Sequence, residues 1–243
     1  MPSYRAIFLD AGYTILSPHS SWEQQLLQVT GRHGIDLSLQ YARRAYEASQ
    51  SFFKAHYYQP NETWTDDAAI LSFCTAYYRL GLEALQCPAA QVPACAEALA
   101  SNINDPKHWR PYPEVQGVLA GLKKASYTVG VLSDWSSSLP AILEALGLRA
   151  YVDLVIVSAI EGVAKPQPAF FQRALARARV RADQALMVGD NLYADIQGAA
   201  RAGIHGILIN RDGWPSPPDV PTIRRLDELW AHLDHRRPIG RPE

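Results

Sequence analysis

The chain has 243 residues, of which 48% are hydrophobic and 19% are charged, and its formal net charge is −1. This composition supplies enough apolar residues for one large core or two modest ones. Acidic and basic residues are spread along the whole length, which excludes a basic face or acidic tail that would bind nucleic acid or an anionic membrane. We therefore expect a small molecule as the partner.

Cysteine content and apolar run lengths limit where the protein works. The 3 cysteines, Cys74, Cys87 and Cys95, are odd in number and lack C-x-x-C spacing, so we expect buried thiols rather than disulfides or a zinc site. The N-terminal apolar run is too short for a signal peptide, and no later run reaches about 18 residues. We expect a cytoplasmic protein, either a monomer or a homodimer.

Short apolar runs rich in Val, Ile and Leu predict buried strands. They lack polar alternation, as is typical of parallel strands covered on both faces, and lie at residues 5–9, 127–132, 152–157, 185–188 and 206–209. Helical patterns at residues 113–125, 139–146, 168–179 and 194–202 separate or follow the later runs. The alternation predicts an α/β fold with a Rossmann-like, doubly wound parallel sheet.

The segment from about residue 16 to 108 has a different pattern, with long periodic stretches and no convincing strand. The stretches are Trp22–Arg32, Leu39–Tyr57, Asp66–Leu80 and Val92–Ser101. We predict an all-helical cap, residues 16–108, inserted into an α/β catalytic core of residues 1–15 and 109–235. The proline-rich end around a helical piece at Leu226–Leu233 predicts a disordered tail at residues 236–243.

Polar residues follow the ends of several predicted strands. Each alone is readily explained as a turn, a helix cap or a solvated charge. In an open parallel sheet, however, ligands bind beyond the carboxyl ends of the strands, where these residues converge. They are Asp10, Ser133 with Asp134, Lys165, Asp190 and, in the following helix, Asp195.

This set of residue types indicates phosphoryl transfer. Clustered carboxylates suit a hard cation such as Mg²⁺, while Ser133 and Lys165 can hold a phosphoryl group. A carboxylate such as Asp10 can attack phosphorus to form an aspartyl phosphate, which water then hydrolyses. Lys165 and the cation would offset the negative charge that otherwise repels Asp10 from the phosphate.

The same positions resemble the motifs of the haloacid dehalogenase-like superfamily. Its first motif, D-x-D-x-T after an apolar strand, is matched by Asp10 to Thr14 except at Gly12, and its strand-end Ser or Thr by Ser133. Its lysine before a helix is matched by Lys165, and its G-D-x-x-x-x-D-x-x-G-A motif by residues 189–199. The helical insertion after the first motif resembles that superfamily's helical cap.

The resemblance implies a role for each of these residues. Asp10 would be the nucleophile, with Lys165 as the second catalytic residue. The cation would be held by Asp10, the carbonyl of Gly12, Asp190 and Asp195. Phosphate would be bound at Ala11, Gly12, Ser133, Asp134 and Lys165, partly through backbone N–H groups.

Gly12 is the departure from the family pattern. Family phosphatases carry a second Asp there, which protonates the leaving group and then activates water, and glycine can do neither. Because general acid–base catalysis contributes about 10²–10⁴-fold, hydrolysis of esters with poor leaving groups should be weakened. Asp134, His19 and His56 are candidates for a substitute acid.

Several functions remain open at this point. The leading prediction is a Mg²⁺-dependent hydrolase of a small phosphorylated metabolite, of the subgroup that lacks the second Asp. Alternatives are a metal-independent 2-haloacid dehalogenase, although Asp190 argues against it, a phosphonatase that uses Lys54, and a phosphate-binding protein with little turnover. We interpret the aromatic cluster Phe52, Phe53, Tyr57, Tyr58 and Trp64 as bundle core.

Overall fold

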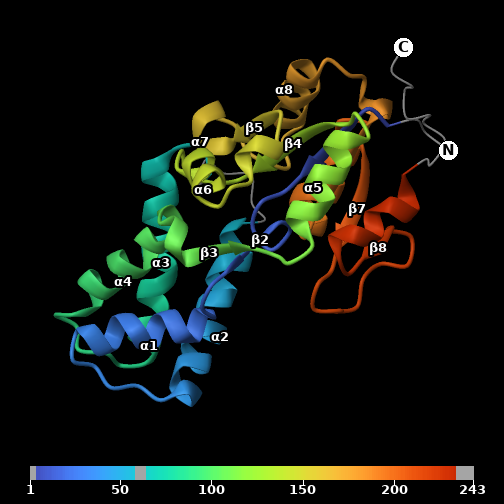
Figure 1. Ribbon diagram of the computed structural model, residues 1–243. Coiled ribbons are helices and arrows are strands. Elements are labelled where there is room, and N and C mark those ends of the chain that lie inside the picture. The colour runs from blue at the N-terminus through green and yellow to red at the C-terminus, as the bar shows by residue number, and fades with distance from the viewer. Residues whose placement is uncertain (1–3, 58–63, 234–243) are drawn as a thin grey trace, which may run out of the picture.

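A computed structural model describes residues 4–57 and 64–233 of the chain, without the side chains of residues 48, 54, 56 and 57 (Figure 1). The predicted tail at residues 236–243 and Tyr58 lie outside the described residues. Within the described ranges the chain forms a layered α/β unit with a group of helices standing to one side of it.

The centre of the α/β unit is a 6-stranded sheet whose paired strands are all parallel, in the order β5-β4-β1-β6-β7-β8. The strands are β1 (Ala6–Leu9), β4 (Thr128–Ser133), β5 (Leu154–Val157), β6 (Ala185–Gly189), β7 (His205–Ile209) and β8 (Thr222–Ile223). The doubly wound α/β class and its apolar strands are confirmed. The edge strand β8 was not predicted, because two residues carry no periodic signal.

Alternate residues of β1, β4, β5 and β6 enter two separate cores, one on each face of the sheet. Ile7 and Leu9 pack toward α5 (Val115–Lys124), α6 (Leu139–Ala145) and the 3₁₀ helix η6 (Leu226–His232). Ala6 and Phe8 pack toward α8 (Pro168–Ala178) and α9 (Gly198–Arg201). Coverage on both faces explains why these strands are apolar throughout.

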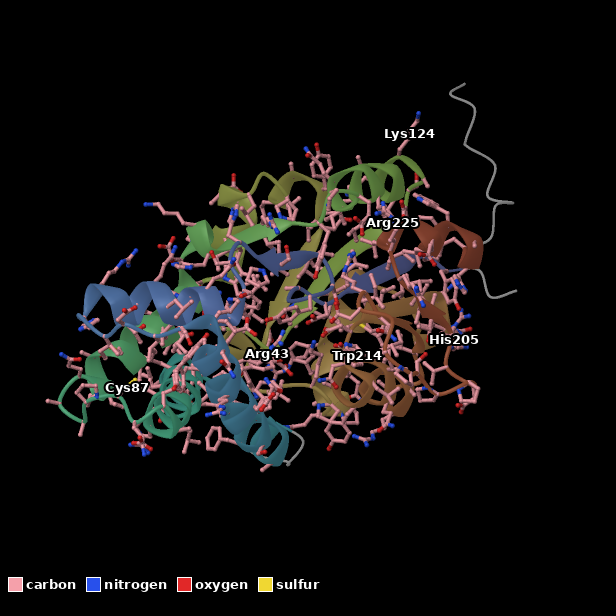
Figure 2. All side chains as sticks on the ribbon, turned by 90° about the horizontal axis from the view of Figure 1, so that it is seen from below. Arg43, Cys87, Lys124, His205, Trp214 and Arg225 are labelled. Atoms are coloured by element: carbon pink, nitrogen blue, oxygen red, sulfur yellow. The ribbon has the colours of Figure 1, made fainter. Side chains whose placement is uncertain are left out.

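The group of helices contains α1 (Trp22–Arg32), α2 (Leu39–Tyr57), α3 (Asp67–Ala84) and α4 (Val92–Ser101). Residues from α1, α2, α3 and α4 share a hydrophobic cluster of their own that includes Leu26, Ala45, Leu82 and Leu99. In Figure 2, Cys87 lies at the outer end of this group, whereas His205 and Arg225 lie at the opposite end of the molecule. The helices expected between residues 16 and 108 are therefore present.

A short antiparallel pair joins this helical group to the sheet. Strand β2 (Leu16–Pro18) pairs with β3 (Trp109–Pro111), so the chain leaves and re-enters the α/β unit at adjacent positions. The expectation of no strand between residues 16 and 108 is wrong at β2. Three residues are too few to show alternation, and Pro18 made the segment look like a turn.

Two further expectations concern the thiols and the membrane. All three cysteines are free, and Cys87 and Cys95 are buried, as the sequence predicted. In the part of the chain that the structure describes, no helix combines the length and apolarity that crossing a bilayer requires.

Candidate active site

Asp10 follows the central strand β1, at the edge where the carboxyl ends of the parallel strands meet. Its backbone N–H donates to the carbonyl of Val188 at 2.9 Å, which extends the pairing of β1 with β6. The chain then turns sharply, because the carbonyl of Ala11 accepts from the N–H of Leu16 at 2.8 Å. Tyr13 takes the left-handed conformation, with φ 54°, within this turn. The turn keeps the backbone of residues 11–13 beside the Asp10 carboxylate.

A buried ammonium group connects two of the carboxylates. Lys165 Nζ lies 2.6 Å from Asp10 Oδ1 and 2.6 Å from Asp195 Oδ1, with its side chain only 2% exposed. Ser133 Oγ, from the end of β4, donates to Asp10 Oδ1 at 3.0 Å. Four residues that the sequence assigned to one site are therefore in direct contact.

Asp190 brings a third carboxylate to the same point. One oxygen from each of Asp10, Asp190 and Asp195 lies within 4.8 Å of the others. Burial raises the pKa of Asp190 well above its usual value, and repulsion from Asp10 and Asp195 raises it further, while Lys165 opposes the rise. Burial likewise raises the pKa of Asp195. One ammonium therefore faces three carboxylates, which leaves excess negative charge.

The loop after β4 is fixed from both sides. Asp134 accepts from the backbone N–H of Lys165 at 2.9 Å, and burial raises its pKa to about 7. Ser137 donates its backbone N–H to Asp67, at the start of α3, at 2.7 Å. This loop, which begins directly after Ser133, thus connects the sheet to the helical group.

The turn after β1 is held by Arg211, which the sequence motifs did not identify. Arg211, from the loop after β7, donates to the carbonyls of Tyr13 at 3.2 Å and Thr14 at 2.6 Å. Its guanidinium also pairs with Glu114 at 2.8 Å and stacks over the ring of Tyr112 at 3.4 Å. Arg211 thereby fixes the backbone beside Gly12.

These groups open into a cavity of about 400 Å³ that extends to the helical group. Its walls include Asp10, Lys165 and Asp190 at one end and aromatic side chains of α1, α2 and α3 at the other. A cavity of this volume accommodates a small organic molecule. The arrangement can thus bind a cation and an anionic group next to a nucleophilic carboxylate.

Comparison with known proteins assigns the family. A model of haloacid dehalogenase-like hydrolases matches residues 4–203. The chain belongs to the haloacid dehalogenase-like hydrolases. It is thus a hydrolase, as the sequence motifs predicted, and the match begins just before β1 and includes the helical group.

Individual relatives support this family assignment. A mouse haloacid dehalogenase-like hydrolase domain-containing protein 3 is 30% identical over 224 residues, or 86% of each chain. A phosphoserine phosphatase of Thermus thermophilus is 30% identical over 153 residues, covering 62% of this chain and 61% of that protein. The vertebrate relatives that carry the same name as the mouse protein match this chain over 59% to 86% of their own length.

A solved structure supports the fold. A HAD-hydrolase of Bacillus subtilis, determined with bound magnesium, superimposes with a TM-score of 0.75 at 22% identity, covering 96% of this chain and 99% of that one. At this identity the likeness concerns the fold alone.

The position of Gly12 in this hydrolase leaves little room for a larger side chain. A Cβ atom built there would lie 3.3 Å from Cζ3 of Trp135, whose ring packs against Trp109 with centroids 4.6 Å apart. Trp135 therefore lies close to the space that a carboxylate at residue 12 would need. Of the other candidate acids, Asp134 lines the cavity, His19 is exposed and not among its described lining residues, and the side chain of His56 is not described.

Some lining residues were not found by sequence reasoning. Gln25, Asn102 and His108 line the cavity, and Asn102 donates to Gln25 at 3.0 Å across 77 positions of sequence. Their types carry no motif, so no local signal identified them. Phe53 and Trp64 were interpreted as bundle core; they belong to a hydrophobic cluster with Phe73, and they line the cavity as well.

Gly189 permits the close approach of Asp195 to the sheet. A Cβ atom at this position would lie 2.2 Å from Cγ and 2.6 Å from Cβ of Asp195, which has no free space to move into because it is fully buried. We expect Gly189→Ala to lower the free energy of unfolding by about 1–3 kcal/mol and to lower activity by displacing Asp195 from Lys165. Urea unfolding and steady-state assays measure both effects. Gly117→Ala is the control, because a Cβ built there, inside α5, meets nothing within 4 Å; it should leave activity unchanged and raise the free energy of unfolding by about 0.5–1 kcal/mol, since alanine favours the helix.

Proposed function

We propose that this chain is a Mg²⁺-dependent hydrolase that removes phosphate from a small phosphorylated molecule by way of a phosphorylated Asp10. The observation that carries the proposal is the cluster of Asp10, Asp190 and Asp195 around Lys165 at the charged end of the cavity. Relatives named as phosphatases support it, including the Thermus phosphoserine phosphatase. We also propose residues 1–15 and 109–235 as the catalytic core and residues 16–108 as a cap over it.

The donor set fits a hard divalent cation. Carboxylate and carbonyl oxygens are the ligands that Mg²⁺ prefers, and three carboxylates gather here within 4.8 Å of one another beside the single ammonium of Lys165. Asp10, Asp190 and the Gly12 carbonyl would hold the ion, with Asp195 beside it. When bound, Mg²⁺ would offset the charge of the carboxylates and of the phosphate.

Each side chain then has a defined task. Lys165 and Ser133 contact Asp10 Oδ1, so they fix the orientation of the carboxylate and can donate to the phosphate oxygens. Backbone N–H groups of Ala11 and Gly12 provide further donors to the phosphate. Because Gly12 supplies no acid, we place the chain in the subgroup that lacks the second Asp, and we expect it to favour good leaving groups.

The deciding experiment measures product release from acetyl phosphate, phosphonoacetaldehyde and 2-chloropropionate, with Mg²⁺ and with EDTA. We expect phosphate release from acetyl phosphate that requires Mg²⁺, because acetate leaves without an acid at residue 12. Chloride release in EDTA would instead show a dehalogenase. Release of acetaldehyde from phosphonoacetaldehyde alone would show a phosphonatase and direct attention to Lys54.

A further inference from the structure

The two ends of the cavity differ sharply in charge. The end formed by the sheet contains Asp10, Asp134, Asp190, Asp195 and the ammonium of Lys165. Among the described residues that line the helical end, none is Asp, Glu, Lys or Arg. Aromatic rings dominate there instead, including Trp22, Phe53, Trp64, Phe73, Tyr77 and Tyr78. A substrate with phosphate at the charged end would place its organic part among these rings.

The rings form a fixed wall, because they pack on one another. Phe73 contacts Phe53 at a centroid distance of 5.8 Å and Trp64 at 5.2 Å, and Trp22 stacks on Tyr78 at 5.9 Å. The polar side chains at this end include the uncharged amides of Gln25, Gln50 and Asn102. A second phosphate, a carboxylate or an ammonium placed here would lose hydration without an opposite charge among the described residues that line this end. A flat apolar ring would gain ring contacts.

Gly12 limits the kind of leaving group that this site can expel. With no acid at this position, the expelled oxygen must depart as an anion or take its proton from water. A phenolic oxygen, with a pKa of about 10, bears this charge far better than an alkyl oxygen, whose pKa of about 16 resembles that of water. The aromatic wall and the missing acid at residue 12 therefore both favour an aromatic group bonded to the phosphate oxygen.

We propose that the helical end of the cavity receives an uncharged aromatic group, so that the substrates of this hydrolase are aryl phosphate monoesters. The proposal rests on the phosphatase function proposed above and names its substrate class. The Asp10 carboxylate forms a bond to phosphorus as the bond from phosphorus to the aryl oxygen breaks. The aryl oxygen keeps that electron pair and takes a proton from water. A water molecule then adds to phosphorus, the bond to Asp10 breaks, and inorganic phosphate leaves while one proton passes to solvent.

The first test compares kcat/KM in Mg²⁺ for 2-naphthyl phosphate, cyclohexyl phosphate, O-phosphoserine and acetyl phosphate. We expect 2-naphthyl phosphate to exceed cyclohexyl phosphate and O-phosphoserine by about 10³-fold, from leaving group and pocket together. A preference for O-phosphoserine would overturn the substrate class. Turnover of acetyl phosphate without turnover of 2-naphthyl phosphate would overturn it too, yet leave the phosphatase function standing. No turnover of any ester would overturn both.

The second test separates the pocket from the leaving group by using inhibitors that are not cleaved. We expect phenylphosphonate to inhibit about tenfold more tightly than methylphosphonate, because only the former has a ring to place against the wall. Phe53→Ala should reduce this ratio several-fold. Tyr41→Ala is the control, because it removes an exposed aromatic side chain from the same helix, α2, that is not among the described lining residues, and it should preserve the ratio. Equal inhibition by the two phosphonates, or equal effects of the two variants, would contradict the proposal.

Discussion

Asp10→Asn is expected to reduce Mg²⁺-dependent phosphate release from acetyl phosphate by at least about 10³-fold, since an amide oxygen cannot replace the carboxylate as nucleophile. The same change should raise the free energy of unfolding in EDTA by about 1 kcal/mol. Asn retains an oxygen that can accept from Lys165 and Ser133, as Asp10 Oδ1 does now. It removes one of three negative charges that lie within 4.8 Å of each other.

Two measurements on one purified variant check this expectation, namely the initial rate with saturating Mg²⁺ and urea unfolding in EDTA. Asp36→Asn is the control, because Asp36 is exposed in the segment between α1 and α2. It should change neither quantity. If Asp10→Asn kept a tenth of the activity, another group would be the nucleophile. If it lowered both activity and stability, Asp10 would act mainly by holding Lys165 in place.

The sheet and most helices were predictable because they depend on long, repeated patterns. Five strands are apolar over at least four residues, and α1, α2 and α4 have the bounds that periodicity predicted. The end of α3 was predicted too early, at Leu80, because Gly81 resembles a helix stop. In the structure a Cβ at Gly81 would lie 2.8 Å from Ser49 Oγ and 3.3 Å from the ring of Trp22. Gly81, inside α3, therefore allows this helix to pack closely against α1 and α2.

The charged end of the cavity was likewise predictable, whereas its aromatic end was not. Asp10 and Asp190 directly follow strands and Ser133 ends one, so the parallel topology alone brings them to one edge. The facing of a cap side chain depends instead on how several helices pack against one another. Phe52 and Phe53 are adjacent and of one type, yet only Phe53 is among the described residues that line the cavity. The role of Arg211 was not predictable either, because it donates to backbone carbonyls, which carry no sequence signal.

Lys165→Met should be the most damaging change to stability, lowering the free energy of unfolding by about 3–5 kcal/mol. Methionine has similar length but no charge, so Asp10 and Asp195 would remain buried without the ammonium that now contacts both at 2.6 Å. Such a loss is a large share of the about 5–15 kcal/mol that stabilises a typical domain. Lys123→Met is the control, because Lys123 pairs with Asp153 at the partly exposed surface, where such pairs contribute about 0–1 kcal/mol.

Magnesium separates two roles of Lys165, namely offsetting the charge of the carboxylates and donating to Asp10 and the phosphate. If the carboxylates form a cation site, Mg²⁺ should raise the melting temperature of Lys165→Met more than that of the wild-type protein, because the ion offsets charge that the ammonium no longer offsets. Phosphate release should nevertheless stay at least about 10²-fold below wild type, since the variant has lost a donor that orients Asp10 and contacts the phosphate. Thermal unfolding with and without Mg²⁺ measures the first effect. An equal Mg²⁺ shift in both proteins would place the ion away from Asp10 and Asp195.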